Sequence, residues 1–210
     1  MIKIIIADDH PIVRAGLKQI ITEENDITVS GESANGPDLL NQVRRRDFDV
    51  VLLDLTMPGM EGIDVLKQLK IEKPHLPVII LTIHPETQYA LRILKAGAAG
   101  YLTKTSAADE LIKAIRKVHH GGKYISTSLA EKIAFALDDE TDKPLHETLS
   151  DREYQVLCLL GSGNTISQIA DHLALSVKTI STYRTRILEK MHMQNNAELI
   201  HYAIQNGLVT

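Results

Sequence analysis

The sequence predicts two units of different fold class: an α/β unit with a doubly wound, five-stranded parallel sheet, then an all-α unit of four helices. Over the first 118 residues, short β-rich apolar runs alternate with segments in which apolar residues recur at helical spacing. Beyond residue 149 only the helical spacing remains. Between the two, Asp138–Thr148 is acidic, contains Pro144 and has no apolar period, which is typical of an interdomain linker.

The expected strands of the first unit are apolar along their whole length. Both faces of such strands are buried, as in a parallel sheet that helices cover on each side. Five strand–helix pairs of this kind complete a doubly wound sheet. The expected strands are Ile2–Ala7, Ile27–Gly31, Val50–Leu53, Val78–Thr82 and Gly100–Leu102. The expected helices are Ile12–Ile21, Asp38–Arg45, Ile63–Leu69, Gln88–Lys95 and Glu110–Val118.

Capping residues delimit the helices of the second unit. Ser150 with Glu153, and Thr165 with Gln168, match the capping-box pattern, and Ser176 is a favourable N-cap. Three helices are therefore expected to begin at these positions, and a fourth is expected at Ala197–Gln205.

The domain organisation follows from these elements. A short helix is expected at Ser128–Leu137, before the acidic segment. We expect one domain at residues 1–119, a linker containing this helix at residues 120–147, and a second domain at residues 148–210.

Composition argues against a membrane protein and a disulfide-bonded one. Apolar runs such as Val50–Leu53 are far shorter than the roughly 20 residues of a membrane-spanning helix. No basic segment followed by a long apolar stretch opens the chain, so no secretory signal is expected. The single cysteine, Cys158, cannot form an internal disulfide. We expect a cytoplasmic protein with no membrane partner.

Positive charge is local in a chain whose net charge is −4. Residues 149–210 hold five cationic side chains, and four of them fall within Lys178–Lys190. This clustering marks one helix as a candidate nucleic-acid surface. Composition alone leaves a small helical interaction domain equally open.

Three carboxylates follow two of the expected strands, Asp8 and Asp9 after the first and Asp54 after the third. Ligand sites in doubly wound sheets lie at the carboxyl ends of the strands. Three like charges placed together need a cation, because mutual repulsion would otherwise protonate one of them. Oxygen ligands favour Mg²⁺, which retains waters and so leaves room for a phosphoryl oxygen. Thr82 and Lys104, after the fourth and fifth strands, suit an anion that arrives at this metal.

The motifs of the first unit resemble the response-regulator receiver over residues 1–118. This resemblance implies the flavodoxin-like strand order 2-1-3-4-5, and it implies that Asp54 accepts a phosphoryl group from a phosphohistidine of a partner sensor histidine kinase. The residues that match are Ile5-Ile6-Ala7-Asp8-Asp9-His10, Leu52-Leu53-Asp54-Leu55-Thr56-Met57-Pro58-Gly59-Met60-Glu61-Gly62, Leu81-Thr82 and Tyr101-Leu102-Thr103-Lys104.

The resemblance also implies a role for each residue around the metal. Asp9, Asp54 and the backbone carbonyl of Thr56 would bind Mg²⁺ directly, and Asp8 would bind it through water. Lys104 would pair with the new phosphate. Phosphoryl transfer depends on such positioning and charge neutralisation more than on covalent assistance.

The same resemblance implies a switch. Phosphorylation adds a charge of roughly −1.5 to −2. Thr82 would turn to hydrogen-bond the phosphate, and Tyr101 would turn inward behind it, which supplies a local two-state element. His84 is either a border of this pocket or an exposed loop histidine.

The second unit resembles the LuxR-type helix-turn-helix of NarL/FixJ-family regulators over residues 149–208. The resemblance implies a supporting helix at Ser167–Leu173 and a recognition helix at Val177–Met191 in the major groove of double-stranded DNA. It also implies a homodimer formed through the last helix. The residues that match are Leu149-Ser150-Asp151-Arg152-Glu153, Val156-Leu157, Leu160, Gly163, Ile169-Ala170, Leu173, Ser176-Val177-Lys178-Thr179-Ile180 and Leu188, Lys190-Met191.

The expected DNA contacts divide by chemistry. Cationic side chains would contact phosphates and set the register, whereas hydroxyls near the helix start would reach base edges. The expected DNA-binding residues are Lys178, Thr179, Ser181, Thr182, Arg184, Thr185, Arg186 and Lys190.

Two other functions were weighed against a phosphorylation-controlled transcription factor. A hydrolase with Asp54 as covalent nucleophile would usually need a second acid two residues later, where this sequence has Thr56. A binding module that ignores phosphorylation would have no use for the complete carboxylate, hydroxyl and ammonium set. We therefore expect a protein that is no turnover enzyme and catalyses only its own phosphorylation and dephosphorylation.

Overall fold

The computed structural model divides into two compact units, which are described one at a time. One unit contains the described residues up to 82 and from 90 to 130, and the other contains those from 144 to 209 together with residues 88, 89 and 131. The structure describes residues 1–57, 60, 62–82, 88–106, 108–126, 129–131, 144–173 and 175–209.

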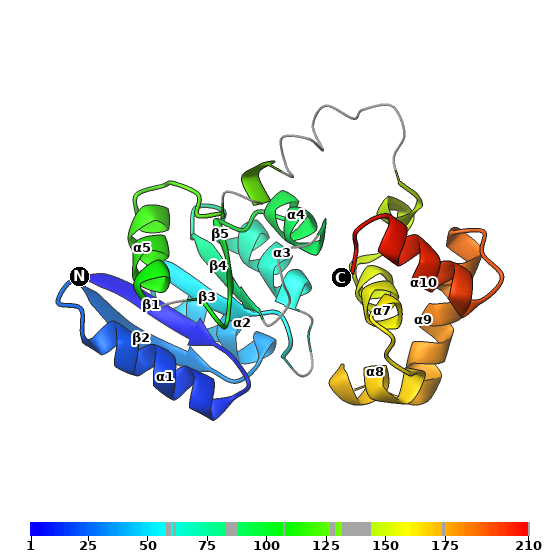
Figure 1. Ribbon diagram of the computed structural model, residues 1–210. Helices are drawn as coiled ribbons and strands as arrows, with labels where there is room; N and C mark the ends of the chain where they lie inside the picture. Colours follow the sequence, from blue (N-terminus) through cyan, green and yellow to red (C-terminus); the bar gives the residue numbers. More distant parts are fainter. Residues whose placement is uncertain are drawn as a thin grey trace. The chain divides into compact units, whose positions relative to one another are not determined.

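The first unit is built on one parallel sheet with the strand order β2-β1-β3-β4-β5, as the receiver resemblance predicted. Helices cover both faces, with α1 and α5 on one side and α2, α3 and α4 on the other (Figure 1). The strands are β1 (Ile2–Ala7), β2 (Ile27–Ser33), β3 (Val50–Asp54), β4 (Val78–Thr82) and β5 (Gly100–Thr103). The helices are α1 (Pro11–Thr22), α2 (Gly36–Arg45), α3 (Gly62–Glu72), α4 (Gln88–Lys95) and α5 (Ala108–His119).

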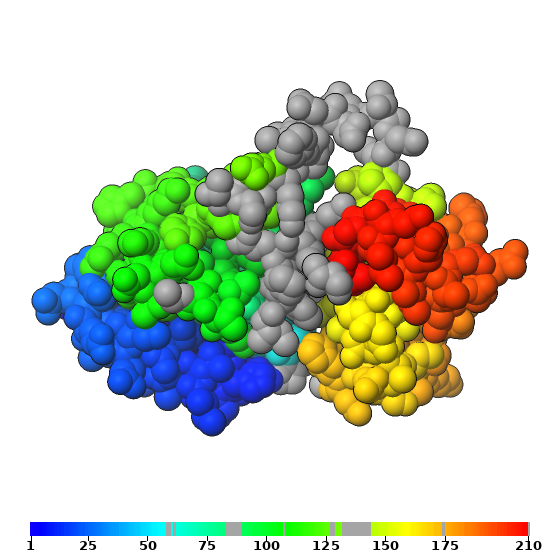
Figure 2. Space-filling model, in the orientation of Figure 1, coloured from blue at the N-terminus to red at the C-terminus, as the bar shows by residue number. Residues whose placement is uncertain are grey.

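Two hydrophobic layers hold the helices against the sheet. Ile4, Leu52 and Ile79 belong to the layer beneath α1 and α5, together with Leu111 and Ile115 of α5. Strand residues of the opposite parity, such as Ile5, Val51 and Ile80, are equally buried on the other face. The blue atoms of α1 and the green atoms of α5 form much of the surface of this unit in Figure 2. The whole-length apolar strands are thus explained by burial on both sides.

The expected strands and helices of this unit are confirmed, with ends shifted by three residues or fewer. The longest shift among strands is in β2, which continues to Ser33 instead of ending at Gly31. A register shift between Ile4 and Ile5 of β1 keeps the two strands paired beyond that glycine. A side chain at position 31 would meet Ile5 and Phe48 at 3.0 Å, so the glycine permits close packing and does not end the strand.

The second unit has the four helices that the capping residues predicted. Both capping boxes are formed. The side chains of Ser150 and Thr165 accept from the backbone N–H groups of Glu153 and Gln168, and their own backbone N–H groups donate to the side chains of these two residues. Ser176 accepts from the Thr179 N–H at the start of the third helix. The helices are α7 (Asp151–Gly161), α8 (Ile166–His172), α9 (Val177–Lys190) and α10 (Asn196–Gln205).

A short 3₁₀ helix, η1 (Leu145–Thr148), precedes α7 where the sequence showed no pattern. Its His146 is buried, and its Nδ1 lies 2.9 Å from the hydroxyl of Tyr202 on α10. The imidazole also packs near the ring of Tyr154 on α7, at 5.7 Å between centroids. These contacts attach the start of the unit to its last helix.

The segment after α5 returns to the sheet. The Tyr124 N–H donates to the Ala99 carbonyl, and the Tyr124 carbonyl accepts from the Tyr101 N–H, at 2.9 and 3.1 Å. The helix expected at Ser128–Leu137 lies largely outside the described residues. Among the helices that the structure describes, none combines the length and the apolar character that crossing a bilayer requires.

Candidate functional site

Three carboxylates meet at the carboxyl end of the sheet. Asp8 and Asp9 follow β1, and Asp54 ends β3, the strand that pairs with β1. Asp8 and Asp54 are almost fully buried, each at 1% exposure, whereas Asp9 is half-buried. With His10 they offer four ligand atoms that all lie within 4.8 Å of one another. This acidic cluster is compatible with a metal site.

Lys104 brings positive charge into the cluster. Its Nζ lies 2.8 Å from Asp54 Oδ2 and 2.7 Å from Asp8 Oδ2. The Lys104 N–H donates to the Thr82 carbonyl at 2.7 Å, which joins the residue that follows β5 to the last residue of β4. Burial lowers the pKa of the ammonium, but hydrogen bonds and attraction from the two carboxylates outweigh burial and raise the pKa above its ordinary value. Lys104 is therefore cationic at neutral pH.

The oxygens of the carboxylates differ in how they are satisfied. Asp54 Oδ1 accepts from the N–H and the hydroxyl of Thr56, at 3.3 and 3.2 Å. Asp8 Oδ1 accepts from the His10 N–H at 2.8 Å. By contrast, Asp8 Oδ2 and Asp9 Oδ1 are buried and accept no hydrogen bond of good geometry. Asp8 Oδ2 lies 2.7 Å from Lys104 Nζ, and Asp9 Oδ1 lies 2.7 Å from His10 Nδ1. Two such oxygens on adjacent residues fit a hard divalent cation.

Thr82 and Tyr101 lie on the two strands beyond Asp54. Asp54 pairs with Leu81, so Thr82 follows directly at the end of β4, and Tyr101 pairs with Ile80. Both side chains are buried, Thr82 at 0% and Tyr101 at 1% exposure. The structure thus places Thr82 beside the carboxylate cluster and Tyr101 inside the fold behind it.

Two further residues, for which the sequence predicted no role, support the site. The Arg14 guanidinium donates to the Asp8 carbonyl at 2.6 Å and lies 3.6 Å from Glu32 of β2, so it fixes the backbone beside the cluster. Gly62 packs against the end of β3, where a Cβ would lie 2.8 Å from the Asp54 carbonyl. Pro58, Gly59, Glu61 and His84 lie outside the described residues.

The helix expected to read DNA, α9, has one buried and one exposed face. Ile180 and Ile187 are buried, while Lys178 and Arg186 are exposed and engage no described residue in a hydrogen bond or ion pair. The hydroxyls along the helix donate to its own carbonyls four residues back. These donors are Ser181, Thr182 and Thr185, at 2.9 to 3.1 Å.

The other two cations of α9 have partners inside the unit. Lys190 Nζ lies 2.6 Å from Glu153 Oε2 at the start of α7. The Arg184 Nε–H donates to Asn196 Oδ1 at the start of α10. Phosphate contacts by Lys190 and Arg184 therefore remain predictions, whereas Lys178 and Arg186 offer their charge to solvent.

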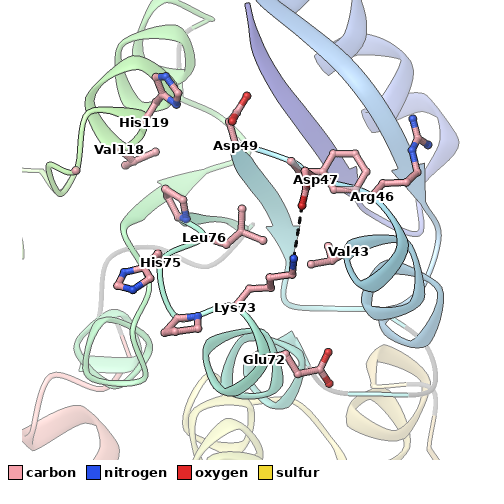
Figure 3. Close-up of a pocket in the computed structure, with 14 residues that line it drawn as sticks. Val43, Arg46, Asp47, Asp49, Glu72, Lys73, His75, Leu76, Val118 and His119 are labelled. Carbon is pink, nitrogen blue, oxygen red and sulfur yellow. Dashed lines mark ion pairs between the residues drawn. The ribbon is translucent and has the colours of Figure 1, made fainter.

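A pocket of about 480 Å³ lies at the amino ends of β3 and β4 (Figure 3). Its walls come from the segments before β3 and β4 and from the end of α5. Lys73 and Asp47 form an ion pair across it, at 3.5 Å. Glu72 on its rim is bound by Arg44, whose hydrogen bond lowers the pKa of that carboxyl to about 2. The carboxylate cluster lies at the other end of the strands, so this pocket is separate from it.

Comparison with known proteins shows the same two parts. A model of the response regulator receiver domain matches residues 4–116, and a model of the LuxR family of bacterial regulatory proteins matches residues 147–203. The response regulator UvrY of Escherichia coli strain K12 is 35% identical over 209 residues, which cover 99% of this chain and 96% of UvrY.

Solved structures agree. RcsB from Salmonella enterica serovar Typhimurium, bound to promoter rprA in the presence of phosphomimetic BeF3⁻, aligns with a TM-score of 0.66 and 29% identity over 96% of this chain and 97% of that one. A structure of two RcsB dimers bound to two parallel DNAs aligns with a TM-score of 0.59 and 30% identity, over 96% of each chain. The chain therefore belongs to the NarL/FixJ family of response regulators, in which a receiver domain is followed by a LuxR-type DNA-binding domain that controls transcription.

Proposed function

We propose that Asp54 of this response regulator accepts a phosphoryl group from a phosphohistidine of a partner sensor histidine kinase. One observation carries the proposal: the Lys104 ammonium lies between the buried carboxylates of Asp54 and Asp8, next to a third carboxylate, Asp9. This arrangement supplies a nucleophile, a counter-charge for the transferred group and ligands for a cation at one point.

The cation of this proposal is Mg²⁺. Asp9, Asp54 and the Thr56 carbonyl would hold it directly, and Asp8 would hold it through water. Asp9 Oδ1, which is buried and accepts no hydrogen bond of good geometry, supports this assignment. When bound, the ion neutralises charge on the transferring phosphoryl group.

The chain's own residues position the acceptor. Thr56 holds one oxygen of Asp54 and Lys104 the other. A carboxylate oxygen forms a bond to phosphorus as the phosphorus–nitrogen bond of the phosphohistidine breaks and its electron pair returns to the imidazole. Lys104 then transfers its hydrogen bond from the carboxylate to the new phosphate. Only this self-modification and its hydrolysis are catalysed, so the protein is no turnover enzyme.

The phosphate alters the fold through Thr82 and Tyr101. Phosphorylation adds roughly −1.5 to −2 units of charge at the end of β3. Thr82, at the adjacent strand end, turns its hydroxyl toward the phosphate, and Tyr101 occupies the space behind it. This change biases dimerisation and DNA binding, as a switch of this type requires.

The second unit binds double-stranded DNA through α9. Lys178 and Arg186 contact phosphates first, because their charges are free of partners among the described residues, while Thr182 and Thr185 reach base edges. The active form is a homodimer, which the RcsB dimers bound to DNA support. Its two copies join through α10. The protein acts in the cytoplasm. Its parts are the receiver at residues 1–119, the linker at residues 120–147 and the DNA-binding domain at residues 148–210.

Phosphate incorporation from a small phosphodonor tests the proposed function. With Mg²⁺, the wild-type protein is expected to take up one acid-stable, base-labile acyl phosphate. Asp54→Asn should lose it, and the control Asp64→Asn, which changes an exposed acid of α3, should retain it. Equal incorporation by Asp54→Asn and wild type would exclude Asp54 as the acceptor.

A further inference from the structure

The side chain of His10 is turned into the carboxylate cluster. His10 is the N-cap of α1, yet its side chain makes no capping hydrogen bond. Its Nδ1 lies 2.7 Å from Asp9 Oδ1 and 3.3 Å from Asp8 Oδ1. The imidazole therefore contacts the cluster and does not cap the helix. Pro11 at the helix start has no N–H group that would need an acceptor.

We infer that His10 Nδ1 is itself a ligand of this metal site. The site then takes divalent transition ions such as Mn²⁺ and Ni²⁺ as well as Mg²⁺. The inference rests on the metal site of the proposed function and adds one nitrogen ligand to it.

The distances suit shared coordination. Neighbouring ligands of an octahedral ion with bonds of about 2.1 Å lie about 3 Å apart. The separation of His10 Nδ1 from Asp9 Oδ1, an oxygen of a carboxylate assigned as a direct ligand, is 2.7 Å and lies close to that value. Asp9 Oδ1, the oxygen that His10 approaches most closely, is one of the two buried oxygens that accept no hydrogen bond. All four ligand atoms also fall within one span of 4.8 Å.

The donor set determines which ions gain from His10. Carboxylate and carbonyl oxygens suit Mg²⁺ and Mn²⁺, whereas imidazole suits ions further along the Irving–Williams series, Ni²⁺ among them. Removing the imidazole should therefore weaken binding of Ni²⁺ much more than binding of Mg²⁺. If His10 only hydrogen-bonds Asp9, its removal should change the two affinities alike. The His10 side chain is 63% exposed, so an entering ion reaches it without opening the fold.

Calorimetric titration with each metal alone separates the two cases. Wild type is expected to bind Ni²⁺ more tightly than Mg²⁺. His10→Gln should lower the Ni²⁺ affinity by about 10-fold or more and the Mg²⁺ affinity by less than about 3-fold. His75→Gln changes an exposed histidine on the loop before β4, and it should alter neither affinity. Asp9→Asn should weaken both ions, which locates the binding at this cluster.

Pulsed electron paramagnetic resonance of the Mn²⁺-loaded protein detects the ligand directly. Wild type should show nitrogen coupling to the bound ion, and His10→Gln should lack it. Mg²⁺ and Mn²⁺ binding without nitrogen coupling, or equal losses for Mg²⁺ and Ni²⁺ in His10→Gln, overturns this inference and leaves the proposed function intact. If wild type binds none of these ions at the cluster, both this inference and the proposed function are overturned.

Discussion

The Lys104 ammonium lies between Asp8 and Asp54, two carboxylates that are almost fully buried. Two buried carboxylates at one point repel each other, so the arrangement calls for positive charge beside them. Lys104 supplies part of this compensation inside the described cluster, and Asp9 adds a further negative charge beside it. A divalent cation would supply the rest. One lysine and one ion would together balance the charge of the site.

Replacing Lys104 tests this balance. Lys104→Met leaves buried carboxylates without their counter-charge and is expected to lower the free energy of unfolding by about 3 kcal/mol in the absence of Mg²⁺. Because Mg²⁺ binds the folded site, it should restore more stability to this variant than to wild type. Urea unfolding with and without Mg²⁺ measures both effects. A variant as stable as wild type without Mg²⁺ would show that Lys104 does not balance these acids.

The main site residues were predictable because they occupy strand ends. Asp8, Asp9, Asp54 and Lys104 follow apolar runs, and the carboxyl ends of parallel strands meet at one edge. Arg14 was not predictable, because its hydrogen bond to the Asp8 carbonyl arises only when α1 packs beside the loop that follows β1. Side-chain partners across a fold leave no periodic signal in the sequence.

At the scale of elements, α9 differs in what its cations contact. Lys190 pairs with Glu153, which also closes the capping box of α7, so this ion pair joins the end of one helix to the start of another. Lys178, near the start of α9, engages no described residue. Both lysines were expected to contact DNA phosphates. Their partners lie on other helices, so the sequence of α9 alone could not separate them.

The two lysines should therefore respond differently to removal. Lys178→Ala is expected to weaken binding to all DNA sequences alike and to reduce the slope of log affinity against log salt concentration by about one. Lys190→Ala should reduce that slope less, because its ammonium is paired with Glu153. Titration of a selected duplex and a random duplex at several salt concentrations measures both. A loss confined to the selected duplex would instead mean that Lys178 reads a base.

The Glu153–Lys190 pair also makes stability depend on pH. Burial raises the pKa of Glu153, but hydrogen bonds from Lys190 and the Ser150 backbone outweigh it and lower the pKa below its ordinary value of 4.5. A carboxyl with a depressed folded pKa stabilises the fold above pH 4.5 and loses that contribution as the pH falls through its folded pKa.

Glu153→Gln removes this titration. The free energy of unfolding of the variant is expected to be about 1 to 2 kcal/mol lower than that of wild type near neutral pH and to approach the wild-type value in acid. Thermal unfolding of the DNA-binding unit across the acid range would follow the difference. A constant difference at every pH would show that the carboxylate charge contributes nothing.

At the scale of the whole molecule, the fold class and the helix and strand positions were predictable, whereas the start of the second unit was not. Strands buried on both faces and formed capping boxes produce strong local patterns. η1 has none, because it is held by contacts of His146 with nearby Tyr154 and with Tyr202, which lies 56 residues further along the chain. Side-chain contacts of this kind leave no periodic pattern from which a helix could be predicted.

The central claim is that modification of Asp54 in the first unit controls the assembly of the second. Molar mass from light scattering, measured with Mg²⁺ before and after addition of the phosphomimetic BeF3⁻, tests it most directly. The mass of wild type is expected to rise from monomer to dimer. Asp54→Asn should not respond, and the control Asp64→Asn should respond as wild type does. An equal response in Asp54→Asn, or none in wild type that has bound BeF3⁻, would contradict it.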